Sequence, residues 1–135
     1  MLSDSLRSLP YLVHTNRELG LMLRGVKPLS YFAYLGEAVQ PDCVVRYLRM
    51  FDRHVAAGRL EKRVQTKPTQ LPDSFLDRIF YTLPGEEWRA TAMIDLLDIP
   101  GDWTHDRERR FGSLLGYEDW QNDIWISRLP KRGAA

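Results

Sequence analysis

The stretch 75–97, FLDRIFYTLPGEEWRATAMIDLL, constrains the fold more than any other part of the chain. Apolar side chains alternate with polar ones before Pro84-Gly85 and recur at helical spacing after it. Alternation is typical of a half-buried strand and the longer spacing of an amphipathic helix, whereas Pro-Gly favours a tight turn. The stretch therefore predicts a strand, a corner and a helix in direct succession, with Trp88 as a core anchor beneath the sheet.

The segments around this corner provide further strands. Residues 29–35 (LSYFAYL) are rich in aromatic side chains, and in residues 60–66 Leu60, Lys62, Val64 and Thr66 alternate with three polar residues, so both stretches favour strands. Residues 67–74 (KPTQLPDS) form a polar loop with two prolines. The strands on either side of this loop most simply make an antiparallel hairpin. Lys62 and Arg63 in the first of them are typical of an edge strand.

The expected helices begin at recognisable signals. At 15–18 a threonine followed three residues later by a glutamate matches the capping-box pattern. A longer helix over 41–57 opens on Pro-Asp and carries one continuous apolar stripe. Two more helices are expected over 104–115 and 118–129, each closed by Gly or Pro.

This order of elements predicts an α+β fold. We expect a small, mostly antiparallel sheet of about three strands, covered by helices on one face, with a helical C-terminal third. A length of 135 residues suits a single domain spanning 1–135. The last residues, 131–135, are expected to be a frayed tail.

Composition excludes several classes of protein. The chain is 44% hydrophobic and 27% charged with a net charge of +1, so neither wholesale disorder nor a function defined by bulk charge is indicated. Cys43 is the lone cysteine and cannot form an intramolecular disulfide. The sequence shows no signal-peptide pattern and no apolar run of the roughly 20 residues that span a membrane. We expect a cytoplasmic protein without a membrane partner.

Charge is segregated along the chain. Residues 46–67 hold seven basic side chains against two acids, and residues 73–106 hold eight acids against two basic side chains. Arg46, Arg49 and Arg53 lie three and four positions apart, so they line one face of the expected helix. Either the two segments neutralise each other in the fold, or the basic one offers a surface to an acidic partner.

Signals for metal or covalent chemistry are weak. Cys43 and His54 lie about 16 Å apart along one expected helix, and neither HExxH nor CxxC occurs, so we expect no metal and no cofactor. Cys43 is interpreted as a small core residue. Glu86 and Glu87 are the best acid–base pair in the sequence. Acids in the first turn of a helix more simply complement its dipole, and we interpret them in that way.

Nucleic-acid binding is the main alternative function. The two expected helices at 104–129 resemble a helix-turn-helix only loosely, because acidic residues crowd the second of them. The basic segment Arg46–Lys67 is a better electrostatic footprint for nucleic acid.

The negative evidence on catalysis favours a non-enzymatic protein-binding or regulatory domain, of immunity, inhibitor or accessory type. Trp103 lies in an expected loop, and Trp125 belongs to a terminal helix that is apolar on more than one side. Such surplus apolar surface predicts a protein partner or self-association. The expected partner-binding residues are Arg46, Arg49, Arg53, Trp103 and Trp125. A hydrolase that uses Glu86 and Glu87 is the third alternative.

Overall fold

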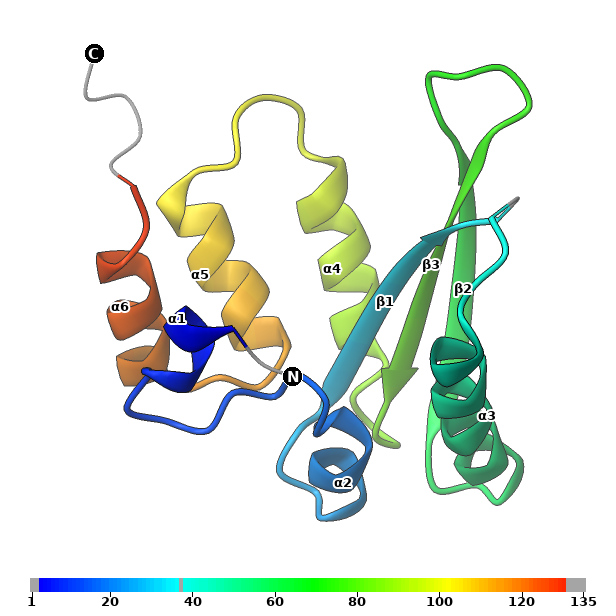
Figure 1. Ribbon diagram of the computed structural model, residues 1–135, viewed down its shortest axis with the longest axis horizontal. Helices are drawn as coiled ribbons and strands as arrows, with labels where there is room; N and C mark the ends of the chain where they lie inside the picture. Colours follow the sequence, from blue (N-terminus) through cyan, green and yellow to red (C-terminus); the bar gives the residue numbers. More distant parts are fainter. Residues whose placement is uncertain (1–2, 37, 131–135) are drawn as a thin grey trace.

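The computed structural model describes residues 3–36 and 38–130 (Figure 1). Its elements in chain order are α1 (Asp4–Arg7), α2 (Glu18–Leu23), β1 (Leu29–Leu35), α3 (Asp42–Ala56), β2 (Glu61–Pro68), β3 (Phe75–Thr82), α4 (Trp88–Asp98), α5 (His105–Leu114) and α6 (Asp119–Ser127). The α+β class is confirmed, with helices collected after the last strand. The tail expected at 131–135 lies outside the described residues.

Strand β3, which precedes the Pro84-Gly85 corner, is the middle strand of the sheet. The strand order is β1-β3-β2, and both pairings are antiparallel. Thr82 of β3 lies opposite Leu29 of β1 on one side and Glu61 of β2 on the other. The β2–β3 hairpin and the edge position of β2 are therefore confirmed. Gly85 makes the turn into α4 with a φ of 87°, a left-handed conformation that favours glycine.

Helices cover both faces of the sheet, which corrects the expectation of a single covered face. Figure 1 shows α3 on one side, and α4 and α5 on the other with α6 beyond them. Phe80 packs with α4 and α5, whereas its neighbour Tyr81 packs with α2 and α3. Tyr81 buries its ring because its hydroxyl donates a hydrogen bond to Asp52 Oδ1 at 2.8 Å. The alternating pattern of β3 predicted only one buried face of the sheet, but Phe80 and Tyr81 are neighbours on opposite faces and both are buried.

The prediction that Trp88 anchors the core is wrong. Its side chain is 51% exposed, and the Arg89 guanidinium lies 4.6 Å from its ring. The buried residues of α4 are Ala90, Met93, Ile94 and Leu96. These residues define a helical face that points away from position 88, so the helix packs through smaller side chains two or more residues further on.

Two expectations in the N-terminal half are also corrected. Helix α2 begins at Glu18 without a side-chain cap, because residues 15–17 form a turn closed by a hydrogen bond from Arg17 N to His14 O at 2.8 Å. Thr15 therefore does not form the expected capping box. Cys43 is exposed rather than part of the core, since the inward stripe of α3 is centred on Phe51.

Candidate functional site

Helices α2 and α3 meet along a seam held by Tyr47. The Tyr47 hydroxyl donates to Glu18 Oε1 at 2.8 Å and accepts from the backbone N–H of Leu19 at 3.3 Å. Burial, together with the Glu18 hydrogen bond, raises the pKa of Tyr47, so its hydroxyl remains a donor. Two adjoining hollows of about 530 and 470 Å³ follow this seam and share Asn16, Tyr47 and Met50. We call them together the α2–α3 groove.

Aliphatic side chains line this groove without being covered. Leu12 of the N-terminal arm (residues 3–15), Leu23 of α2 and Met50 of α3 are each between 43% and 46% exposed. Single exposed apolar residues are ordinary, but three that line one hollow form a contiguous patch. Cys43 lines the neighbouring part of the groove. The groove is therefore an apolar strip open to solvent.

Five exposed arginines flank this strip. Arg17, Arg24 and Arg46 line the groove, and Arg49 and Arg53 continue along α3. Within residues 3–36 and 38–130, none of them forms an ion pair with a carboxylate. We refer to Arg46, Arg49 and Arg53 as the α3 arginines. The predicted basic helix face exists, and its charge is not neutralised by the described part of the chain.

The other cations of the basic segment are engaged within the fold. Lys62 pairs with Asp52 at 2.8 Å, and Lys67 pairs with Asp98 at 2.6 Å. Arg63 donates to a threonine hydroxyl of α4 at 2.8 Å. Lys67 and Arg63 therefore contact the acidic segment, whereas Lys62 pairs with an acid of α3, and the α3 arginines have no carboxylate partner among the described residues.

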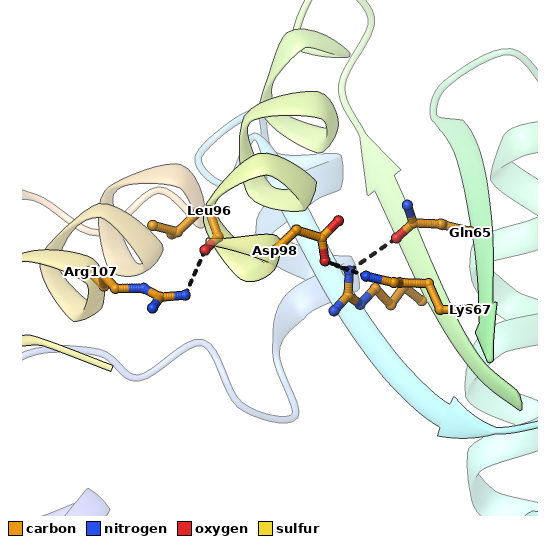
Figure 2. A network of polar contacts seen from close by, with 6 residues as sticks. Gln65, Lys67, Leu96, Asp98 and Arg107 are labelled. Atoms are coloured by element: carbon orange, nitrogen blue, oxygen red, sulfur yellow. Dashed lines mark hydrogen bonds and ion pairs between the residues drawn. The ribbon is translucent and has the colours of Figure 1, made fainter. Parts of the chain in front are cut away.

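Asp98 at the end of α4 is the centre of a polar network with the sheet (Figure 2). Arg78 of β3 donates to Asp98 Oδ1 at 2.9 Å and to Gln65 Oε1 at 3.1 Å. The hydrogen bond from Lys67, followed by that from Arg78, lowers the pKa of Asp98. Because Arg78 is almost completely buried, this network fixes the end of α4 against the sheet, and we interpret it as scaffold.

Cations also hold the carbonyl oxygens at helix ends. Arg107 Nη2 donates to Leu96 O of α4 at 2.9 Å, as Figure 2 shows. Arg89 and Lys27 together occupy the carbonyl oxygens of residues 113–115 at the end of α5, at distances between 2.9 and 3.2 Å. Positive charge is favourable at the C-terminal end of a helix. These contacts tie α5 to α4 and to the chain that leads into β1.

Lys27 is buried, which the sequence did not reveal. Only 2% of the residue is exposed, and its Nζ lies 2.8 Å from His14 Nδ1. His14 stacks on the ring of Tyr117 at 3.8 Å between centroids. Burial lowers the pKa of Lys27 to about 7 and that of His14 to about 3, although the charge of Glu18 opposes the shift of Lys27. The one feature of the sequence that could have indicated this burial is the position of Lys27, directly before Pro28 and the buried start of β1.

Glu86 and Glu87 were expected in the first turn of a helix, but α4 begins at Trp88, so Glu87 is its N-cap residue and Glu86 precedes it. Glu86 accepts from Arg89 Nε at 2.8 Å, and Glu87 accepts from the backbone N–H of Gly85 at 2.9 Å. The Gly85 hydrogen bond lowers the pKa of Glu87, and a hydrogen bond with Glu87 raises the pKa of Glu61 on β2. Glu61 and Glu87 are solvent-exposed. Water therefore screens the interaction between Glu61 and Glu87. The pair does not provide the buried acid that the hydrolase alternative needs.

Trp103 and Trp125 lie on the other side of the sheet from the α3 arginines. Both indole N–H groups donate to the carboxylate of Glu108, that of Trp125 at 2.9 Å. Both side chains are half-buried, and Trp103 packs against the core formed by α4 and α5. The predicted partner-binding residues thus divide into two groups, and the groove contains only the arginine group. Its apolar residues were not predicted, because exposed Leu12, Leu23 and Met50 resemble core residues in the sequence.

Comparison with known proteins gives no relative from which a function can be transferred: no family model, no curated protein and no solved structure matches the chain. Within the described residues, no three His, Cys, Asp or Glu side chains are grouped to hold a metal ion. No helix in that part of the chain is long and apolar enough to cross a membrane.

Proposed function

We propose that this chain is a non-enzymatic, protein-binding domain that takes an acidic, apolar-faced segment of a protein partner along the α2–α3 groove. One observation carries the proposal: an uncovered aliphatic strip lies beside arginines that have no carboxylate partner in the described structure. Arginine binds carboxylates through two parallel hydrogen bonds. A partner with carboxylates on either side of leucine-like side chains complements both features.

The character of the strip favours a protein over a nucleic acid. Leu12, Leu23 and Met50 are flexible aliphatic side chains, of the kind that repack around apolar partner residues. Surfaces that bind single strands instead present aromatic faces to stacked bases. Two tyrosines line the groove, but the hydroxyl of Tyr47 is fixed by Glu18 and its ring contacts Phe51, and Tyr34 lines only the part next to Cys43. The same arginines would serve a phosphate backbone, so nucleic acid remains the alternative that the experiment must separate.

The aliphatic strip and the arginines are expected to contribute differently to partner binding. Charges at the rim of an interface accelerate association and make it sensitive to salt, whereas apolar contacts at its centre hold the complex. An immunity, inhibitor or accessory role fits such a surface. A reducing, cytoplasmic location fits the exposed thiol of Cys43.

Fluorescence polarisation with designed peptides tests the proposal. The probe is a labelled helical peptide with glutamate on one face and leucine on the other. We expect it to bind, and to lose about tenfold or more in affinity when its leucines become serine or its glutamates become lysine. Single- and double-stranded oligonucleotides are the competing probes. If they bind more tightly than the peptide, or if no peptide binds at low salt, the proposal is wrong.

Alkylation of Cys43 reports where the peptide binds. Cys43 is the sole cysteine of the chain, it is exposed, and it lines the groove beside Tyr34 and Arg46. We expect the bound peptide to slow the reaction of this thiol with a maleimide, and the serine peptide to leave the rate unchanged. Unchanged alkylation under saturating peptide would place the binding site elsewhere and contradict the proposal.

A further inference from the structure

A second site lies between the N-terminal arm and helices α5 and α6. There the structure contains a cavity of about 260 Å³ that is partly open to solvent. A cavity of about 150 Å³ with an aliphatic and aromatic lining is already large enough to bind benzene. The apolar residues that matter for the argument are Leu6, Leu9, Phe111, Leu115, Tyr117 and Trp125. Size and lining therefore suit a small molecule with a flat apolar body.

Asn122 of α6 gives this cavity a polar point of attachment. The residue lines the cavity and is only 4% exposed. Its Nδ2 donates to Ser113 Oγ at 3.1 Å, whereas its Oδ1 accepts no hydrogen bond from the described residues. An amide oxygen without a hydrogen-bond partner at a cavity wall is an available acceptor, and a ligand N–H would satisfy it.

Gly112 makes room for this amide. A Cβ atom at position 112 would lie 2.1 Å from Asn122 Oδ1, so the oxygen occupies the space that any other residue would fill. Gly112 also lines the cavity. The close approach to the glycine Cα–H group suits the oxygen rather than the nitrogen of the amide. The glycine and the asparagine thus together present an acceptor at the cavity wall.

The surrounding charges favour a neutral ligand. The two carboxylate oxygens of Glu108, which also lines the cavity, already accept the indole N–H groups of Trp103 and Trp125. The charge of Arg128 acts on Tyr11 at one wall, and Lys27 Nζ lies 5.9 Å from the ring of Tyr117 at another. A ligand cation would meet the charge of Arg128 while the nearest carboxylate is engaged, and Lys27, which releases its proton near pH 7, adds no negative charge.

We propose that this cavity binds a small, neutral, planar molecule that carries one N–H donor, and that Asn122 Oδ1 accepts that donor. The site is separate from the α2–α3 groove and does not depend on the function proposed for the groove.

Three ring compounds of the same size test the proposal by protein-observed NMR titration. Indole offers an N–H donor, indene offers no polar group, and benzofuran offers only an acceptor. We expect indole to shift the side-chain amide signals of Asn122 and to bind about fivefold to tenfold more tightly than indene, as one hydrogen bond to an unpaired acceptor predicts. Equal affinities for indole and indene, tighter binding of benzofuran, or no binding of any probe would overturn the proposal.

Two variants locate the bound probe. Asn122→Leu removes the acceptor and should make the affinities for indole and indene equal. Leu6→Trp should fill the cavity without touching Asn122, so it keeps the test valid if the first variant fails to fold. Leu12→Trp is the matched control, because Leu12 belongs to the same arm but faces the α2–α3 groove. Indole binding should disappear in Leu6→Trp and persist in Leu12→Trp; the reverse result would contradict the assignment.

Discussion

The two sides of the sheet use their cations for different purposes. On the side of α4, α5 and α6, Arg89, Arg107 and Lys27 donate to carbonyl oxygens at helix ends, and Arg109 pairs with Asp123. On the opposite side, the α3 arginines are exposed and meet no carboxylate within the described residues. The same kind of side chain is thus scaffold on one side and open surface on the other.

This difference shows why a count of charges along the chain cannot identify a binding surface. A cation at the C-terminal end of a helix donates hydrogen bonds to backbone carbonyl oxygens, and a count of acidic and basic side chains does not include these oxygens. The strand part of the basic segment is also engaged, through Asp52 and Asp98. Only the arrangement in space separates structural cations from free ones.

The largest effect is expected from Lys27, the most deeply buried of the fixed cations. The unfolded chain holds a proton on Lys27 up to about pH 10.5, but the folded chain releases it near pH 7. Between these values the unfolded state binds more protons, so the free energy of unfolding rises with pH, by several kcal/mol at about 1.4 kcal/mol per pKa unit. Urea unfolding at a series of pH values measures this slope. The slope should vanish in Lys27→Met; an unchanged slope would mean that Lys27 is not buried in the folded state.

Arg89 provides the next largest effect. Its guanidinium donates to Glu86 and to two carbonyl oxygens at the end of α5. Arg89→Ala leaves these acceptors partly buried without a donor, and we expect the free energy of unfolding to fall by about 2–4 kcal/mol. Chemical denaturation checks the value. If Arg89→Ala lowered the free energy of unfolding as little as the loss of an exposed arginine does, the cations on the two sides of the sheet would not differ in their structural role.

The α3 arginines should show the smallest effect on stability. Arg46→Ala, Arg49→Ala and Arg53→Ala each remove an exposed side chain without a charged partner in the described structure. Each should change the free energy of unfolding by no more than about 0.5 kcal/mol. Thermal and urea unfolding of the three single variants tests this expectation. A loss comparable to that of Arg89→Ala would show that these arginines belong to the scaffold.

Much of the fold followed from local patterns in the sequence. The strand–turn–helix corner at 75–97, the hairpin across the proline-rich loop and the long helix α3 were all predicted close to their observed bounds. Each depends on the spacing of apolar residues or on turn residues, which act over short distances. Helix α5 likewise begins close to the expected residue 104, and Thr104 caps it by accepting a hydrogen bond from the backbone N–H of Arg107.

The features that escaped prediction depend on contacts between distant segments. Lys27 is buried because His14 and a carbonyl oxygen at the end of α5 meet it, and no local pattern contains that contact. Trp88 is exposed because α4 packs through a face that only the position of the sheet determines. The groove was half predicted: the arginine face was visible as a helical repeat, but its apolar strip combines the N-terminal arm, α2 and α3.

One comparison of affinities tests the central claim most directly. The triple variant R46A/R49A/R53A removes three charges beside the groove, and R7A/R110A/R128A removes three exposed charges from α1, α5 and the end of α6. We expect the first to weaken binding of the glutamate–leucine peptide by about tenfold or more at low salt and the second to leave it within about twofold. Equal losses in both variants would show that the peptide senses only net charge, and would contradict a binding surface on the α2–α3 side.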